Sequence, residues 1–394
     1  MTADIEQIYE RLYAYCESRG FAGYDPFDGL NSGVFQWSPL KYSRAGRLAF
    51  LQLVKRSSVN LRPVLGVDKG VNPKGLALFA LGELARFRST SEDVHAGNAK
   101  RLLDRLMATA IVSRTADGQK TTSFGYNFDW QSRVFFAPRG TPAIVPTAFA
   151  FRAFVGAYEV FEDARFLEIA EEICRFIVTG LNLSVETADD ICFSYTPVDR
   201  TAIYNASLLA AECLARFGKL AQNEEYLEVA GKAARFVIRR QRDDGAWVYG
   251  EENKQAWADN FHTAFILSSL YRIADDVEAV SVEAGDAIKK GVLYWLGNFF
   301  LTDGTPKYYD NEIYPVDIHS AAAAIVSLAE LRKLDGRMLP LAEKVAAWTC
   351  ANMLDDEGFF YYQKRKNSIV KTPFMRWGQA WMAYALAALI EARR

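Results

Sequence analysis

The chain has 394 residues, of which 48 are acidic, 46 are basic and half are apolar. This balance gives no electrostatic reason to expect a nucleic acid or an anionic membrane as a partner. The chain also shows no signal peptide and no apolar run long enough for membrane insertion. Its five cysteines are scattered without metal spacing, which predicts buried free thiols in a reducing compartment, so we expect a cytoplasmic protein.

The first third of the chain alternates helical segments with long loops. Apolar residues at helical spacing predict a helix over residues 5–18, and a loop rich in Gly, Pro and Asp follows over 23–32. Further helices are expected over 43–56, 73–87 and 93–111. The helix over 73–87 is apolar on nearly all sides, which indicates a buried helix, whereas the helix over 93–111 carries charges on one face.

The rest of the chain alternates two kinds of helix, separated by short loops that contain glycine and aromatic residues. Residues 123–130 alternate aromatic and polar side chains, which is typical of an extended segment. We expect nearly all-apolar helices over 146–160, 201–217, 261–273, the stretch after residue 317, and 376–391. We expect helices with one polar face over 162–178, 224–241, 282–299 and 340–353.

The starts of the late apolar helices are evenly spaced. They fall at residues 201, 259, 317 and 376, in steps of 58, 58 and 59 residues. A fixed period of this size indicates stacked supersecondary units. Six pairs of one apolar and one polar-faced helix predict an all-α fold, an (α/α)6 toroid with the apolar helices as the inner ring. An open α-solenoid is the alternative, because it also has a period and a binding groove.

The repeat has consequences for domain organisation and for the site. We expect residues 1–394 to form a single barrel domain, with 1–42 as an N-terminal helix-and-loop extension. Because the helices alternate in direction, all inner helices begin at the same end of the barrel. The loops that precede them then build one concave face, and this face is the expected site.

Polar residues occupy the starts of two apolar helices. Asp259 is a predicted N-cap and His262 follows one turn later, close to the same face. Asp317 precedes His319 at the next repeat. Asp259, His262 and Asp317 are candidate catalytic residues, and His319 is a candidate substrate contact. A helix cap and a hydrogen-bonded core histidine are the structural alternatives for these residues.

Asp129 is the fourth candidate catalytic residue. Its aromatic neighbours can raise the pKa of a carboxyl group, as a general acid requires, although a structural turn explains it equally well. A cavity lined with aromatic rings and a few polar groups suits a sugar, whose apolar faces stack and whose hydroxyls hydrogen-bond. The candidate substrate-binding residues are His319, Arg376, Trp377, Gln379, Arg139, Trp130, Tyr126, Tyr204, Asn205, Arg200, Asn72 and Lys74.

Signals for cofactors are missing from the sequence. The chain has three histidines, and neither they nor the cysteines show the spacing of a zinc site. Neither a Walker loop nor a dinucleotide glycine fingerprint is present, nor the G-x-S-x-G turn of a serine hydrolase. We therefore expect neither a metal nor a cofactor.

Two segments resemble known proteins. Residues 376–381, Arg-Trp-Gly-Gln-Ala-Trp, resemble the end of glucuronyl C5-epimerase domains. Residues 259–263, Asp-Asn-Phe-His-Thr, resemble a motif of proteins encoded with bacterial polysaccharide synthesis. With its repeated loops and apolar helices, the chain resembles the six-hairpin, (α/α)6-barrel superfamily, which includes unsaturated glucuronyl hydrolases, polysaccharide lyases and N-acylglucosamine 2-epimerases. The resemblance implies oligosaccharide or polysaccharide substrates, often uronic acids, and polysaccharide-assembly proteins as partners.

Three functions are compatible with these residues. The favoured one is a glycoside hydrolase for acidic glycans, in which Asp259 and a second carboxyl group, Asp129 or Asp317, act as acid and base. The second is a sugar epimerase or lyase, in which a histidine or tyrosine removes a proton and a cation such as Arg376 stabilises the enolate. The third is a toroid that binds a glycan or a partner protein without catalysis.

Overall fold

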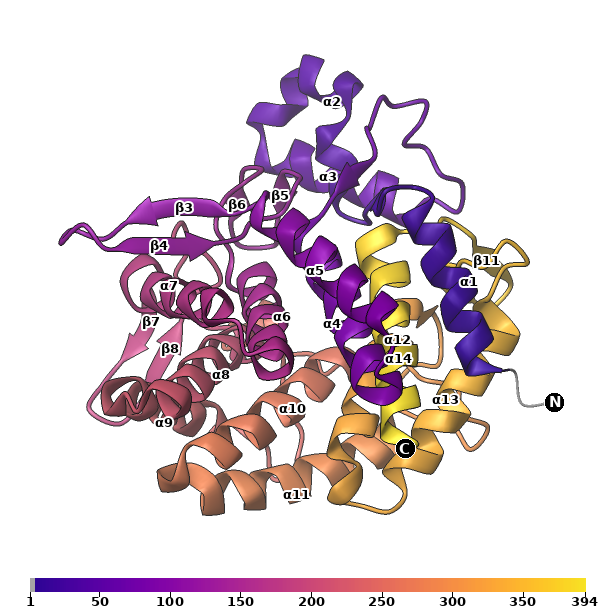
Figure 1. The fold of residues 1–394 in the computed structure, drawn as a ribbon. Coiled ribbons are helices and arrows are strands. Elements are labelled where there is room, and N and C mark those ends of the chain that lie inside the picture. The colour runs from indigo at the N-terminus through magenta and orange to yellow at the C-terminus, as the bar shows by residue number, and fades with distance from the viewer. Residues whose placement is uncertain (1–3) are drawn as a thin grey trace.

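The computed structural model describes residues 4–394, and within this range six helices form a closed inner ring (Figure 1). In chain order they are α4 (Pro73–Thr90), α6 (Ile144–Phe161), α8 (Tyr204–Ala221), α10 (Asn260–Asp276), α12 (Ile318–Glu330) and α14 (Trp381–Ala392). Each packs against the next, and α14 packs against α4. Ring closure excludes the open solenoid and confirms the predicted (α/α)6 toroid.

An outer helix covers each inner one. Five of them follow their inner partners in the chain: α5 (Asp93–Met107), α7 (Ala164–Gly180), α9 (Glu224–Ile238), α11 (Ser281–Asn298) and α13 (Met338–Met353). The sixth is α1 (Ile5–Glu17), which packs against α14. The first helix of the chain therefore pairs with the last, and part of the expected N-terminal extension completes the outer ring.

Composition explains which helices lie inside. In α12 every residue from Ile318 to Ala329 is buried, and a run of four alanines lets neighbouring helices approach closely. By contrast, α7 buries residues three or four positions apart, including Phe166, Ala170 and Ile173, and leaves its polar face outside. Helix α6 is long and apolar enough to cross a membrane by composition, but two thirds of it is buried among its neighbours. All five cysteines, which lie in the described range, are buried and free, as predicted.

Short antiparallel pairs of strands form the loops. Pairs join β3 (Ile111–Arg114) to β4 (Lys120–Ser123), β5 (Trp130–Gln131) to β6 (Phe136–Ala137), and β7 (Leu183–Glu186) to β8 (Ile191–Phe193). Strand β10 (Gln363–Arg365) lies between β9 (Val316–Asp317) and β11 (Ser368–Val370), and β1 (Ala22–Gly23) pairs with β2 (Gly70–Val71). Several of these pairs lie at the end where the inner helices begin, which we call the mouth.

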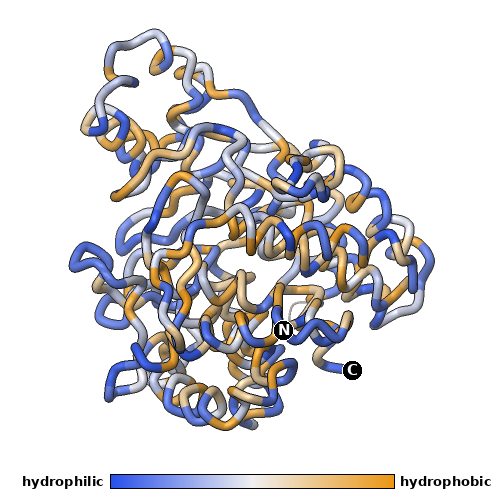
Figure 2. Tube along the Cα trace, turned by 90° about the vertical axis from the view of Figure 1, so that its left-hand side faces the viewer, coloured by the Kyte–Doolittle hydropathy of each residue, from blue (hydrophilic) through white to orange (hydrophobic). Residues whose placement is uncertain are grey.

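Residues 24–69, which we call the cap, project above the mouth (Figures 1 and 2). The cap contains the 3-10 turns η1 (Asp28–Asn31) and η2 (Pro39–Tyr42) and the helices α2 (Gly33–Trp37) and α3 (Arg44–Arg56). It has a small apolar core of Leu30, Phe35 and Leu51. Side chains join it to loops of the barrel, as where Arg47 Nε donates to Gln131 Oε1 at 2.7 Å. The cap therefore bounds the mouth from above.

Candidate active site at the barrel mouth

Asp259 and His262 form a dyad at the start of α10. The backbone N–H of His262 donates to Asp259 Oδ1 at 3.0 Å, which is the predicted N-cap. His262 Nδ1 lies 2.6 Å from Asp259 Oδ2, and Trp257 Nε1 donates to the same oxygen at 3.0 Å. A carboxylate that receives these bonds acts as an acceptor, so Nδ1 carries the proton and the lone pair of the neutral ring lies on Nε2. The Asp259 carboxylate thus both caps the helix and orients the imidazole of His262.

His319 is the second imidazole at the mouth. Its Nδ1 lies 3.3 Å from the carbonyl oxygen of Trp377, which can only accept, so Nδ1 is again the donor. The ring stacks on the Trp377 indole at a centroid distance of 4.0 Å. Burial, together with the charges of Lys74 and Arg376, lowers the pKa of His319 well below its usual value. The imidazole is therefore neutral near pH 7, with its lone pair on Nε2.

The two imidazoles share one apolar neighbour. Phe261 lies 4.0 Å from the His262 ring and 4.8 Å from the His319 ring, measured between centroids. Within the described residues, neither Nε2 atom has a hydrogen-bond partner. His262 keeps 18% of its side chain exposed, whereas His319 is 1% exposed. The mouth therefore holds two lone pairs in apolar surroundings, one of them open to solvent.

Aromatic residues surround His262, and the sequence analysis did not identify them as site residues. Tyr249 stacks on Trp257 at 4.9 Å and lies 4.5 Å from the His262 ring. The Arg133 guanidinium lies 4.6 Å from the centre of the Trp257 ring. The available signal was the position of Trp257, two residues before a capping aspartate. From there its indole N–H can reach the carboxylate of Asp259, as it does here.

Lys74, in the first turn of α4, lies inside the ring. Its Nζ is 4.3 Å from the Phe149 ring and 5.0 Å from the Trp381 ring. Burial, with the neighbouring charges of Arg376 and Arg152, lowers the pKa of Lys74 well below its usual value. Lys74 thus contributes a buried amine near His319 rather than the exposed cation that binding an anionic sugar would need.

Arg376 lies in the π-helical turn η6 (Met375–Ala380), which leads into α14. Its guanidinium donates two hydrogen bonds to the Asp25 carboxylate of the cap, at 2.7 and 2.8 Å. This buried pair satisfies the charge that we had expected to bind a substrate anion. A cavity of about 220 Å³ lies beside it, between cap and barrel. Its polar lining includes Asp25, Asp28, Asn31, Asp68, Lys69, Asn72, Asn127, Arg139 and Arg376.

Other predicted site residues hold the mouth together. The Gln379 amide accepts from the Phe360 N–H and donates to the Phe360 carbonyl, both at 2.8 Å. Asp317 caps α12 and also accepts from Gln363 Nε2 at 2.7 Å and Trp377 Nε1 at 2.9 Å. Burial raises the pKa of Asp317 despite these bonds. The polar groups of Gln379 and Asp317 are therefore hydrogen-bonded to other parts of the protein.

Asp129 and Asn72 fix the loops between cap and barrel. Asp129 Oδ1 accepts from the backbone N–H of Arg139 at 2.7 Å, and Oδ2 lies 3.4 Å from Gln36 Nε2 in the cap. Asn72 caps α4 and donates from Nδ2 to Asn127 Oδ1 at 2.7 Å. Both side chains therefore bind protein groups. For Asp129 the sequence analysis had kept such a structural role as the alternative, whereas Asn72 had been predicted only to bind substrate.

The remaining candidates fall into two groups. Tyr126 and Tyr195 share a hydrogen bond between their hydroxyls at 2.9 Å, and Trp130 packs on Tyr195 at 5.1 Å, forming an aromatic cluster under the cap. The others are Tyr204, Asn205, Arg139 and Arg200. Tyr204 donates to Glu251 at 3.0 Å and Asn205 is buried, whereas Arg139 and Arg200 are exposed. The structure thus does not gather all the predicted residues around one centre.

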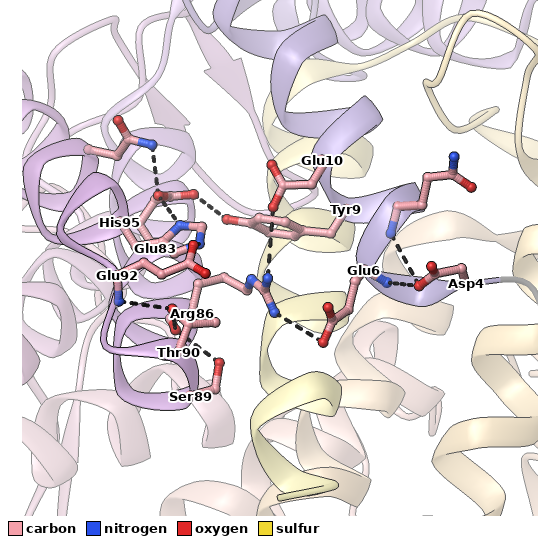
Figure 3. Close-up of polar contacts among 12 residues, drawn as sticks. Asp4, Glu6, Tyr9, Glu10, Glu83, Arg86, Ser89, Thr90, Glu92 and His95 are labelled. Carbon is pink, nitrogen blue, oxygen red and sulfur yellow. Dashed lines mark hydrogen bonds and ion pairs between the residues drawn. The ribbon is translucent and has the colours of Figure 1, made fainter.

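The third histidine, His95, lies elsewhere, where α1, α4 and α5 meet (Figure 3). Its Nδ1 is 2.9 Å from Glu83 Oε2, and the same carboxylate receives hydrogen bonds from Tyr9 and from Asn98. This buried cluster ties the N-terminal helix to the barrel. Within residues 4–394, no group of three or more His, Cys, Asp or Glu side chains is arranged to hold a metal ion.

Comparison with known proteins relates the fold to solved structures. No family model matches the chain, and no curated protein matches it in sequence. Cellobiose 2-epimerase from Bacillus thermoamylovorans is similar with a TM-score of 0.60 and 12% identity, covering 84% of this chain and 90% of that one. An unsaturated glucuronyl hydrolase specific for heparin has a TM-score of 0.62 and 14% identity, covering 98% and 95%. A polysaccharide lyase has a TM-score of 0.61 and 10% identity, covering 100% and 97%. The chain therefore has the same (α/α)6-barrel fold as these structures.

Proposed function

We propose that this protein is a carbohydrate-active enzyme that transfers a proton at a sugar carbon next to a carbonyl or carboxylate, as a sugar epimerase does. The observation that carries the proposal is that His262 and His319 have the same hydrogen-bonding pattern. In both rings Nδ1–H is bound by a fixed acceptor and Nε2 offers a lone pair. Similar structures include a cellobiose 2-epimerase and a D-mannose isomerase, which supports a sugar as substrate.

The proposed chemistry uses the two rings as proton carriers. Epimerisation needs one group that removes a proton from carbon and another that returns a proton to the opposite face. His262 removes the proton, and Asp259 is placed to stabilise the imidazolium that forms. His319 is the second carrier. Arg376 lowers the pKa of His319 and so keeps its imidazole neutral, while its own charge is paired with Asp25.

Hydrolysis by two carboxylates, which the sequence analysis favoured, has less support at this site. Asp259 and Asp317 each receive three hydrogen bonds from protein groups. Asp129 is bonded to the loop that it stabilises and to the cap. A general acid and a water-activating base both need free oxygens that face the glycosidic bond. We therefore place proton transfer ahead of hydrolysis.

The polar cavity under the cap supports a sugar as ligand. Its lining includes the charged side chains of Asp68, Lys69 and Arg139, but neither His262 nor His319. Such groups offer paired donors and acceptors to adjacent hydroxyls of a sugar ring. A role in bacterial polysaccharide synthesis, with assembly proteins as partners, rests on the sequence resemblance and stays a prediction. A cytoplasmic location rests on the cysteine pattern and also stays a prediction.

The test is NMR in deuterated water with reducing disaccharides and uronic-acid oligosaccharides, saturated and unsaturated. We expect deuterium to enter a ring carbon, usually with inversion there. His262→Asn and His319→Asn should each reduce this exchange about 10²–10⁴-fold. Asparagine keeps a donor near the Nδ1 position and removes only Nε2, so the fold should be retained. His95→Asn is the matched control, because His95 also bonds a buried carboxylate but lies outside the mouth.

Two results would count against the proposal. New reducing ends without deuterium in the ring would identify a hydrolase. Line broadening of a glycan without exchange or cleavage, across the whole panel, would identify a binding protein instead.

A further inference from the structure

The cap carries much of the exposed apolar surface of the molecule. In the described chain, sixteen large hydrophobic residues are exposed, and seven of them lie between residues 34 and 64. Trp37 is 93% exposed and Tyr42 is 80% exposed, and Leu53, Val59 and Val64 are each more exposed than buried. Single exposed hydrophobic residues are common on proteins, but a concentration of them marks an interaction surface.

These residues follow the outer faces of the cap helices. In α3 the exposed positions Ala45, Ala49 and Leu53 recur every four residues and so lie on one face, whereas Leu51 and Val54 are buried. In α2, Val34 and Trp37 are exposed while Phe35 enters the apolar core of the cap. Each of these helices therefore has one apolar face inside the cap and another in solvent.

The same stretch is strongly basic. Residues 33–67 contain six cationic side chains and no carboxylate, although the whole chain has a net charge of −2. Arg62 is paired with Asp28 inside the cap, and Lys55 lies 4.1 Å from the Phe27 ring, so neither contributes to the outer surface. Arg44 and Arg56 are exposed beside the apolar face of α3. The balanced total conceals this local charge.

We propose that the outer face of the cap binds an anionic lipid membrane peripherally. Exposed Trp and Tyr side chains favour the headgroup region, aliphatic side chains favour the edge of the hydrocarbon layer, and cations favour anionic headgroups. An acidic glycan would match the arginines and Trp37 but not the exposed Leu53, Val59 and Val64. A lipid surface matches both the charge and the aliphatic groups. This inference does not depend on the proposed catalytic function.

The test is sedimentation of the full chain with vesicles. We expect binding to vesicles of phosphatidylcholine with about 30% phosphatidylglycerol, little binding to phosphatidylcholine alone, and a marked loss of binding in high salt. The double variant Trp37→Ser/Leu53→Ser should bind about tenfold more weakly, since it loses much of the inserted surface. Arg44→Gln/Arg56→Gln should bind about tenfold more weakly, because each cation contributes near an anionic surface.

A matched control tests whether the effect belongs to the cap. Val282→Ser/Leu293→Ser removes two exposed hydrophobic residues from α11 and should leave vesicle binding within about twofold of wild type. Circular dichroism checks that each variant is folded. If Trp37→Ser/Leu53→Ser does not fold, Tyr42→Ser/Val59→Ser replaces it in the vesicle experiment.

Three outcomes would overturn the proposal. The first is equal binding to neutral and anionic vesicles, or binding to neither. The second is self-association in the ultracentrifuge that the Trp37→Ser/Leu53→Ser variant abolishes, which would make the face a contact with a second copy. The third is binding to heparin or alginate, lost in the same variants, without binding to vesicles.

Discussion

Two groups of buried or half-buried polar residues on the inner helices can be compared, one at the mouth and one farther along the barrel. The second group, which we call the charge belt, consists of Arg152, Glu212, Arg272 and Glu330, one residue from each of α6, α8, α10 and α12. Neighbours in the belt alternate in sign and contact one another at 2.5, 2.6 and 2.5 Å. At the mouth, by contrast, His262 and His319 bond protein groups through Nδ1 only.

The two groups differ in what they leave unpaired. Burial opposes ionisation of Glu212, but Arg152 and Arg272 outweigh it and lower its pKa to about 2, so the charges of the belt are satisfied by one another. Glu330 Oε2 is an exception, since it has no partner within the described residues. The mouth keeps two imidazole lone pairs open. Burial alone therefore does not distinguish structural from functional polar groups. The mouth differs from the belt in that both of its imidazoles have an unused acceptor.

The largest expected effect is at the mouth. In Asp259→Asn the helix cap is retained, because asparagine is also a good N-cap. Its NH2 group, however, cannot accept the hydrogen bond from His262 Nδ1–H, so the ring changes tautomer and the lone pair moves from Nε2 to Nδ1. We expect deuterium exchange into the sugar to fall by about 10⁴-fold, the size seen for this change in a serine protease triad. Unfolding in urea should change little, and an active variant would contradict the role given to the dyad.

In the charge belt we expect the opposite pattern. Glu212→Ala leaves Arg152 and Arg272 without their shared carboxylate in the interior, which should reduce the free energy of unfolding by about 3–5 kcal/mol. Activity per folded molecule should persist. Equilibrium urea unfolding measures the loss. The control Glu343→Ala breaks an exposed pair with Arg393 and should have an effect of at most about 1 kcal/mol.

Gln379 tests whether a polar residue of the mouth is structural. Gln379→Ala leaves the N–H and carbonyl groups of Phe360 unpaired, so we expect a loss of about 1–3 kcal/mol in unfolding free energy. The Michaelis constant for any substrate found should stay within about twofold, since catalysis does not use this side chain. A large rise in the Michaelis constant with normal stability would instead show that Gln379 binds substrate, as the sequence predicted.

The smallest expected effect is on the pH dependence of stability. The pKa of His319 is lower in the folded protein than the ordinary 6.5. The full free energy of unfolding is therefore present above pH 6.5, where the ring is neutral in both states. It decreases as the pH falls, because the unfolded state then binds a proton that the folded state does not. This residue should lower the unfolding free energy by about 1.4 kcal/mol per pH unit below that point. His319→Asn should remove this slope between pH 6.5 and 5. Glu212→Gln should not, because Glu212 is ionised in both states over that range.

The repeat is the feature that sequence analysis predicted best. The ion pairs of the charge belt join residues that are 60, 60 and 58 positions apart, close to the period of 58 in the helix starts. The caps Asp259 and Asp317 were also predictable, because an N-cap acts on amides two or three residues away. Such features depend on neighbours in the chain or on a pattern repeated along it.

Other features depend on residues far apart in the sequence. Arg376 is paired with Asp25, which lies 351 positions away in the chain. The sequence therefore could not show that a carboxylate of the protein neutralises its charge. The acceptor that fixes the proton of His319 is a carbonyl oxygen 58 positions away. The basic, apolar cap was hidden by the charge balance of the whole chain. No pattern within a single segment contains this information.

The sequence by itself therefore determined the helices, their buried faces and the ring that they form. A side chain with an apolar face must bury it, and six equal units can do so by closing on one another. Only the tertiary structure decided that α1 completes the outer ring, that a cap bounds the mouth, and that His262 and His319 keep free acceptors. The physical reason is that the state of a buried polar group is set by the partners that folding brings to it, and most of these lie far away in the chain.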